Sequence, residues 1–173
     1  SLGVATLDAI DDKGNLYAKT NKLTPSDTLT SKIINLSEAD EDSLYFSFFY
    51  QGGGKGEAPE EKDSLILEFY NNNDSVWKKI FSAPGESHNN FTQKNIKVDT
   101  AYLSANFQFR FRNLTSVSEN EVIGGKGAVG NADMWHLDYI RLMHAPSKES
   151  LESLNDMAVT DLLPSSFKTY YTI

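Results

Sequence analysis

Residues 106–113 read NFQFRFRN, and this stretch decides the fold class. Along it, phenylalanines alternate with polar residues: Phe107, Phe109 and Phe111 with Gln108, Arg110 and Arg112. Successive side chains of a β-strand point to opposite faces, so the phenylalanines share one face and the polar residues the other. A strand with one apolar and one polar face is typical of an antiparallel sheet that covers a core on one side.

Further stretches have strand character, and turn-forming residues separate them. Alternation is clear in 43–51 and 63–70 and weaker in the others: 3–8, 28–36, 76–82, 91–98 and 134–142. The connections are rich in Gly, Asn, Asp and Pro, and no helical period is sustained before residue 147. The pattern predicts an all-β protein with about eight strands in two stacked antiparallel sheets, a β-sandwich of the jelly-roll type.

The pattern changes after Leu142, which divides the chain into two parts. Residues 1–145 are predicted to form one jelly-roll module, and residues 146–173 a C-terminal extension. We interpret the extension as the start of a following domain or as an added strand of the sandwich. Neighbouring domains of a larger chain are therefore expected partners.

Charge and composition exclude several classes of function. The 173 residues carry a formal net charge of −8 and no cysteine, and the arginines are Arg110, Arg112 and Arg141. Nucleic-acid binding needs clustered basic residues, so it is not expected. No apolar run approaches the roughly 20 residues of a membrane-spanning helix, so membrane insertion is not expected. The lack of cysteine removes disulfides and thiolate metal sites.

The motifs of phosphate binding and serine hydrolysis are incomplete. GGGKGEAP (52–59) lacks the Gly-Lys-Ser/Thr ending of a phosphate loop and precedes a strand, so it is interpreted as a flexible inter-strand loop. The histidines, His88, His136 and His144, accompany no G-x-S-x-G elbow. A serine hydrolase is therefore not expected.

A jelly-roll glycoside hydrolase stays open as an alternative function. Its chemistry needs two carboxylates about 5–9 Å apart that face one groove. Glu68 and Asp138 are the candidates, but neither has an acidic neighbour on its own strand face. Glu60, Glu61 and Asp63 lie where a loop meets a strand and are interpreted as a solvated rim.

The polar face of 106–113 is the candidate ligand-binding surface. If that face is concave, its side chains can bond sugar hydroxyls or a carboxylate, with an aromatic platform from Tyr70 or Tyr45. The predicted ligand-binding residues are Gln108, Arg110, Arg112, Glu68 and Tyr70. The alternative is an ordinary solvated face in which Arg110 pairs with Glu68, worth under about 1 kcal/mol.

The stretch NADMWHLDYIRL (131–142) contains a candidate metal ligand. Period two predicts the direction of its side chains: Trp135, Leu137 and Tyr139 inward, His136 and Asp138 outward. The first and last strands of a jelly roll commonly lie side by side, which would bring Asp8 near Asp138. With backbone carbonyls, these two aspartates would suit a structural Ca²⁺ or another hard cation. The alternative is an Asp138 satisfied by backbone amides.

The order of these segments resembles that of MAM domains. The segments are SKIINL, SLYFSFFYQGGGKGEAPEEKDSLILEFY, SVWKKIFSAPGESHNNFTQKNIKV, FQFRFRN and MWHLDYIRL, and the resemblance runs from residue 3 to 142. It implies a concanavalin-like jelly roll in an extracellular adhesion protein, without catalysis of its own. The family's cation site uses acids that match Asp8 and Asp138. The family's disulfide cysteines are absent here, and Tyr139 stands where the family has a second aspartate.

The cysteine-free version of this pattern is similar to segments of large secreted proteins of gliding-type Gram-negative bacteria, which are cargo of type IX secretion. We therefore expect a secreted or cell-surface module that binds or mediates adhesion rather than catalyses, with a glycan or a protein as its ligand. A glycoside hydrolase and an architectural spacer are the alternatives.

Overall fold

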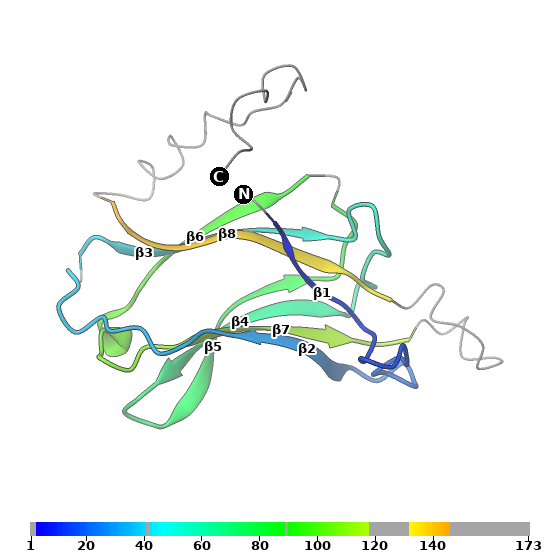
Figure 1. The fold of residues 1–173 in the computed structure, drawn as a ribbon, viewed down its shortest axis with the longest axis horizontal. Helices are drawn as coiled ribbons and strands as arrows, with labels where there is room; N and C mark the ends of the chain where they lie inside the picture. Colours follow the sequence, from blue (N-terminus) through cyan, green and yellow to red (C-terminus); the bar gives the residue numbers. More distant parts are fainter. Residues whose placement is uncertain (1–2, 41, 89, 118–131, 146–173) are drawn as a thin grey trace, which may run out of the picture.

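Two antiparallel sheets stack face to face in the computed structural model, which describes residues 3–40, 42–88, 90–117 and 132–145 (Figure 1). The described residues form eight strands and a single turn of 3₁₀ helix, η1 (Thr100–Tyr102). The strands are β1 (Ala5–Leu7), β2 (Thr24–Thr30), β3 (Leu44–Gly52), β4 (Ser64–Asn71), β5 (Val76–Pro84), β6 (Thr92–Lys97), β7 (Phe109–Thr115) and β8 (Trp135–His144). The predicted all-β sandwich is confirmed.

The order of the strands is that of a jelly roll. One sheet runs β1-β8-β3-β6 and the other β2-β7-β4-β5, so the chain changes sheet at every connection between strands except the β4–β5 hairpin. Every neighbouring pair is antiparallel. The first and last described strands, β1 and β8, lie side by side, as the sequence predicted.

Aromatic side chains fill the space between the sheets. Phe107 and Phe111 are 0% exposed, and Phe109 packs on Phe46 from the opposite sheet with ring centroids 4.8 Å apart. Burying each such ring contributes roughly 2–3 kcal/mol to folding. The alternation in 106–113 therefore placed the phenylalanines on the correct face.

The second strand lies earlier than predicted. The sequence indicated 28–36, but β2 ends at Thr30 and the chain leaves the sheet there. Ile33 is 61% exposed, and Ile34 returns only for an isolated bridge to Phe107. The apolar residues after Thr30 thus belong to a loop. β2 accommodates Pro25 because it is an edge strand with a bulge after that residue.

The direction predicted for Tyr139 is wrong, because β8 contains a β-bulge. Asp138 pairs with Phe49 and Arg141 with Ser47, so β8 has an extra residue between these pairs. Trp135 and Leu137, before the bulge, point into the core as predicted. Tyr139 is 50% exposed.

All the described strands lie within the predicted module 1–145, and after β8 the Ala145 backbone N–H donates to Ser43 O at 2.8 Å. The predicted C-terminal extension, 146–173, lies outside the described residues. Within the part of the chain that the structure describes, there is no helix with the length and apolar character needed to span a membrane.

Candidate metal centre

The glycine-rich connection between β3 and β4 is fastened to the residue that precedes β8. The Gly53 N–H donates to Met134 O at 2.8 Å, and the Met134 N–H donates to Glu57 O at 3.0 Å. Gly53 has a φ of 72°, which glycine adopts without strain. The connection is an inter-strand loop that leads into β4, as predicted, but these bonds fix its course. These hydrogen bonds bring the acidic segment that follows the loop next to the start of β8.

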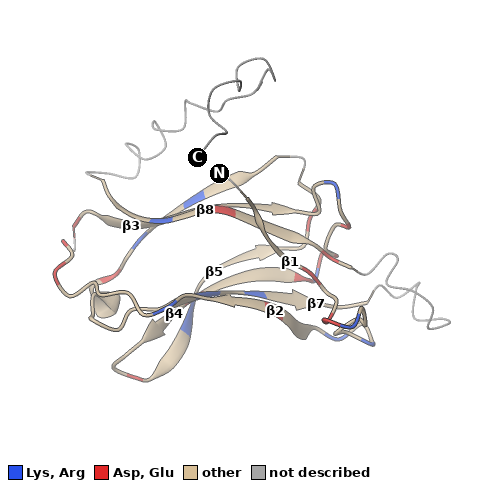
Figure 2. Cartoon of the chain, in the orientation of Figure 1, with Lys and Arg blue, Asp and Glu red and all other residues tan. Residues whose placement is uncertain are grey.

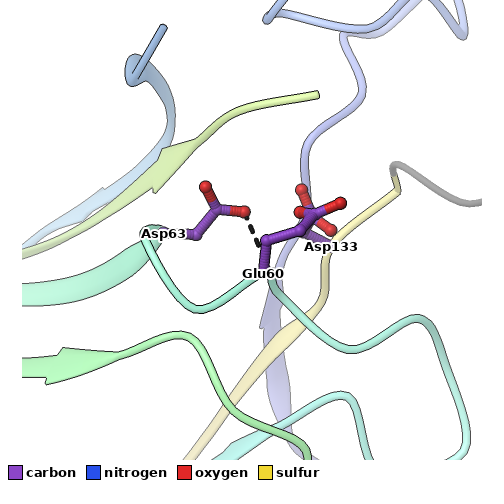
Figure 3. Close-up of side chains that lie close together, drawn as sticks. All are labelled: Glu60, Asp63 and Asp133. Carbon is purple, nitrogen blue, oxygen red and sulfur yellow. Dashed lines mark hydrogen bonds between the residues drawn. The ribbon is translucent and has the colours of Figure 1, made fainter. Parts of the chain in front are cut away.

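Three acidic side chains meet at this place (Figure 3). Glu60 and Asp63 come from the β3–β4 connection and Asp133 from the segment before β8, and one oxygen of each lies within 4.8 Å of the others. Asp63 is 1% exposed and Asp133 is 0% exposed, while Glu60 is partly buried. The prediction of a solvated rim is therefore wrong for Glu60 and Asp63, and it holds for Glu61 alone.

This burial separates the triad from the other acids of the protein. Most acidic positions lie in the connections at the ends of the sandwich, as Figure 2 shows. Asp63 and Asp133 instead continue the inward-facing rows of their strands, Asp63 with Leu65 and Asp133 with Trp135. An acid in an inward register needs a partner, and that is the sequence signal that could have revealed this site.

Hydroxyl groups at the end of β7 hold one oxygen of each aspartate. Ser116 Oγ donates to Asp63 Oδ1 at 2.5 Å, and Thr115 Oγ1 donates to Asp133 Oδ2 at 2.5 Å. The backbone N–H of Glu60 donates to Asp63 Oδ2 at 3.2 Å. These bonds fix the direction of the carboxylates, because a hydrogen-bonded buried group has few alternative rotamers.

Other oxygens of the triad have no partner. Asp133 Oδ1 and Glu60 Oε2 are buried and accept no hydrogen bond. Among the described residues, no Lys, Arg or His forms an ion pair with any of the three acids. Burying a carboxylate without a counter-charge costs several kcal/mol, so the arrangement requires a proton or a cation.

The pKa values express this requirement. Burial raises the pKa of Glu60 to about 8, with further contributions from a hydrogen bond between its side chain and that of Asp63 and from the nearby charges of Asp133 and Asp63. Burial raises the pKa of Asp133 to about 6, although the hydrogen bond from Thr115 acts in the opposite direction. Near neutral pH, the triad therefore binds a proton in the absence of a cation.

The donor set of the triad suits a hard cation. Carboxylate oxygens are the ligands that Ca²⁺ prefers, and two oxygens bound to one Ca²⁺ at 2.3–2.6 Å lie at most about 5 Å apart. The limit of 4.8 Å between the triad's ligand atoms is compatible with that geometry. The buried triad of Glu60, Asp63 and Asp133 can hold a metal ion.

The predicted metal ligands Asp8 and Asp138 are not brought together. Ala5 pairs with Leu137 and Leu7 with Trp135, so Asp8 continues the β1–β8 ladder opposite position 134 and Asp138 opposite position 4. Four positions along a strand correspond to about 13 Å. Asp8 Oδ1 accepts from the Ile10 N–H at 2.9 Å, and Asp138 Oδ1 accepts from the Tyr139 N–H at 2.7 Å. Both acids bind backbone amides, which was the alternative for Asp138.

The predicted ligand-binding residues do lie together, on the outer face of the β2-β7-β4-β5 sheet. Arg110 Nε donates to Glu68 Oε2, and Arg112 Nη2 donates to Glu68 Oε1 at 3.1 Å. Gln108 Nε2 donates to Ser31 O at 3.0 Å. The pairing of Arg110 with Glu68 is the one that the alternative anticipated.

Trp77 completes this group, and the sequence analysis did not single it out. The Arg110 guanidinium carbon lies 4.3 Å from the centroid of the Trp77 ring, and the Tyr70 ring lies 5.3 Å from it, edge-on. Glu68 is 7% exposed. Glu68 therefore pairs with both arginines inside the group, and it is too enclosed to reach a substrate as a catalytic acid.

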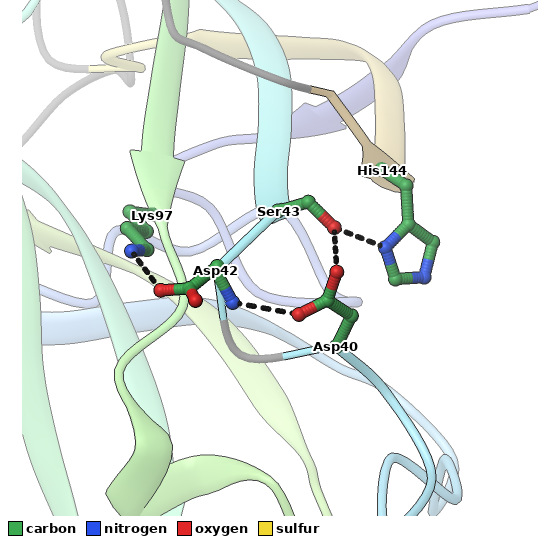
Figure 4. Close-up of polar contacts among 5 residues, drawn as sticks. All are labelled: Asp40, Asp42, Ser43, Lys97 and His144. Carbon is green, nitrogen blue, oxygen red and sulfur yellow. Dashed lines mark hydrogen bonds and ion pairs between the residues drawn. The ribbon is translucent and has the colours of Figure 1, made fainter.

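A contact between serine and histidine occurs at the opposite end of β8 (Figure 4). Ser43 Oγ donates to Asp40 Oδ2 at 2.9 Å and lies 3.0 Å from His144 Nδ1. Since the serine has one proton and the ionised aspartate can only accept, His144 must donate to Ser43. A nucleophilic serine needs a histidine that accepts its proton, so this order of contacts is not a catalytic triad. The network joins the start of β3 to the end of β8.

No model of a known protein family matches the chain, and a search of curated proteins finds no match either. The MAM-like resemblance and the assignment to type IX secretion cargo therefore stay predictions from the sequence.

Proposed function

We propose that this chain is a non-catalytic binding module whose sandwich is stabilised by Ca²⁺ at Glu60, Asp63 and Asp133. The observation that carries the proposal is the pair of buried oxygens, Asp133 Oδ1 and Glu60 Oε2, that have no partner among the described residues. A Ca²⁺ ion between them would offset two of the three negative charges of the ionised triad and fasten the β3–β4 connection to β8.

The chemistry of the donors favours Ca²⁺ over the other common divalent ions. Zn²⁺ prefers nitrogen and sulfur ligands, and the triad supplies oxygen alone. Mg²⁺ requires a near-ideal octahedron and usually keeps several waters, whereas Asp63 and Asp133 are almost fully buried. Ca²⁺ accepts an irregular set of six to eight oxygens, which carboxylates and nearby carbonyls of a loop can provide.

Two considerations support a module that works outside the cell, in a secreted or surface protein. Extracellular modules bind Ca²⁺ with dissociation constants of roughly 10⁻⁴–10⁻³ M, and a partly formed acidic site at a loop fits that range. The resemblance of the sequence segments to MAM domains also favours adhesion or ligand recognition. An architectural spacer would share the ion site but bind no further ligand.

One observation favours the glycoside hydrolase as a second candidate. The raised pKa values of Glu60 and Asp133 are of the kind found in catalytic acid–base pairs. Their burial argues against it, because both carboxylates of a hydrolase must reach the glycosidic bond. Release of reducing sugar from a polysaccharide panel, abolished by Asp133→Asn, would favour the hydrolase over the proposal.

Calorimetric titration of chelator-treated protein with CaCl₂, together with thermal unfolding, tests the proposal. We expect one saturable site, and a rise of roughly 5–10 °C in Tm at a hundredfold excess over Kd. Glu60→Gln and Asp133→Asn should each weaken binding at least tenfold, whereas Glu61→Gln, at the exposed neighbouring position, should not. Identical melting curves in Ca²⁺ and in chelator would refute the ion site.

A further inference from the structure

The β-bulge in β8 gives Tyr139 an unusual backbone conformation. Its φ is 48°, in the left-handed region that a bulky residue seldom occupies. Such a conformation costs about 1–3 kcal/mol and persists where surrounding contacts impose it. Here the side chain of Asp138 accepts a hydrogen bond from the Tyr139 N–H at 2.7 Å. The strained residue is thus held in place by its own neighbour.

The result is an exposed aromatic ring with a fixed direction. Tyr139 is 50% exposed and lies on the outer face of the β1-β8-β3-β6 sheet. Its ring packs against Phe49 at a centroid distance of 6.1 Å, and the Arg141 guanidinium carbon lies 5.5 Å from the ring centroid. A ring that is already ordered loses little conformational entropy when a ligand stacks on it.

Polar groups surround the ring on the same face. Gln93 is the β6 partner of Phe49, and its Nε2 donates to Asn95 Oδ1 at 3.2 Å. Arg141 is exposed, and no carboxylate in the described part of the chain forms an ion pair with it. Within the described residues no acid competes for its guanidinium donors, which would bind a carboxylate bidentately.

We propose that this outer face of β8 and β3 binds an acidic glycan, with a sugar ring stacked on Tyr139 and its carboxylate paired with Arg141. An aromatic ring takes up the apolar face of a sugar, and a guanidinium pairs with its carboxylate. Arg141 supplies a local positive charge for the carboxylate, since it has no acidic partner among the described residues of a protein whose net charge is −8. The inference rests on the proposed function in treating the chain as a binding module.

The face predicted from the sequence is a poorer candidate for the same ligand. Glu68 already pairs with both Arg110 and Arg112, and the Arg110 guanidinium covers the Trp77 ring. A carboxylated sugar would have to displace Glu68, whose side chain is 9% exposed.

Affinity electrophoresis tests this inference, with glucuronoxylan or hyaluronan in the gel and the carboxyl-reduced form of each polymer as its matched control. We expect at least one acidic polymer to retard the protein, and its reduced form to retard it at least fivefold less. Tyr139→Asn and Arg141→Gln should abolish the retardation, since asparagine tolerates a left-handed φ and keeps the bulge. Arg110→Gln, on the opposite sheet, should retain it.

Three outcomes would overturn the inference, and they differ from failure of the ion site. Equal retardation by an acidic polymer and its reduced form removes the role of Arg141. Retardation that is lost in Arg110→Gln and kept in Tyr139→Asn moves the ligand to the other sheet. No retardation by any polymer, in protein that still shows the Ca²⁺-dependent rise in Tm, rejects the glycan face and leaves the ion site in place.

Discussion

Gly85 lies directly against the backbone of Glu60. A Cβ atom at position 85 would be 1.6 Å from the Glu60 carbonyl oxygen, and the Gly85 N–H donates to Asp63 O at 2.7 Å. The glycine therefore allows the end of β5 to approach the acidic turn closely enough to hold it. The position of two triad members depends on a residue that has no side chain.

Gly85→Ala should disturb the triad without removing a carboxylate. The methyl group cannot fit beside backbone atoms, so the turn from Glu60 to Asp63 must move. We expect a lower Tm and an affinity for Ca²⁺ weakened at least tenfold, measured by calorimetric titration. Gly3→Ala is the matched control, because nothing lies within 4 Å of a Cβ there. An unchanged Ca²⁺ affinity in Gly85→Ala would show that the turn does not position the ligands.

The stability of the metal-free protein should fall as the pH rises. The pKa of Glu60 is about 8 in the folded protein against its usual 4.5, and that of Asp133 about 6 against 3.8. Between the usual and the raised values the folded state binds more protons than the unfolded chain, so the free energy of unfolding decreases with pH. In chelator, Tm should drop from pH 5 to pH 8.

Saturating Ca²⁺ should flatten this dependence, because the bound ion keeps the carboxylates ionised at every pH in the range. Glu60→Gln in chelator should also reduce the slope, since it removes the group with the highest pKa of the triad. Parallel curves of Tm against pH with and without Ca²⁺ would contradict the assignment.

Removing Glu68 should cost more than removing an acid of an ordinary surface pair. Glu68→Ala leaves Arg110 and Arg112 without their common partner in a mostly enclosed position, and we expect a loss of about 1–3 kcal/mol. Asp74→Ala breaks the exposed pair with Lys78 and should cost less than about 0.5 kcal/mol. Urea unfolding measures both, and equal losses would mean that the Glu68 cluster is solvated.

The core should be far less tolerant at Phe111 than the surface is at Phe91. Phe111 is 0% exposed and contacts rings of the opposite sheet, so Phe111→Ala should cost about 3–5 kcal/mol. Phe91 is 37% exposed, and Phe91→Ala should cost under about 1 kcal/mol. Denaturant midpoints compare the two, with Phe111→Leu as the milder variant if the alanine protein does not fold.

The sequence predicted what local alternation determines. The strands at 43–51 and 63–70 were located to within a residue or two, because a period of two in side-chain character is visible along the chain itself. The assignment of 28–36 was right only as far as Thr30, since apolar residues alone do not distinguish an edge strand from a loop whose Ile33 faces solvent. Tyr139 was predicted to point inward because the period of two was continued along the whole strand. The bulge in β8 shifts that period, and no residue pattern in the sequence marks the bulge.

The candidate sites depend on contacts between distant segments. Glu60 and Asp63 meet Asp133 through loop hydrogen bonds that pair Gly53 and Glu57 with Met134, and no spacing rule connects these positions. The region was nevertheless indicated, since NADMWHLDYIRL contains Asp133 as well as the predicted Asp138. The predicted ligand was Asp138, the outward acid of that stretch, whereas its inward acid, Asp133, belongs to the triad.

The antiparallel pairing of β1 with β8 has a mechanical consequence. β1 enters the sheet at Ala5, opposite Leu137, on the side toward which β8 continues to His144. Tension between residues 3 and 145 would therefore open the rungs of this ladder one after another, beginning at Ala5 and Leu137, instead of shearing all of them together. The first strand would peel away at low force, while the ladder between β8 and β3 stayed closed.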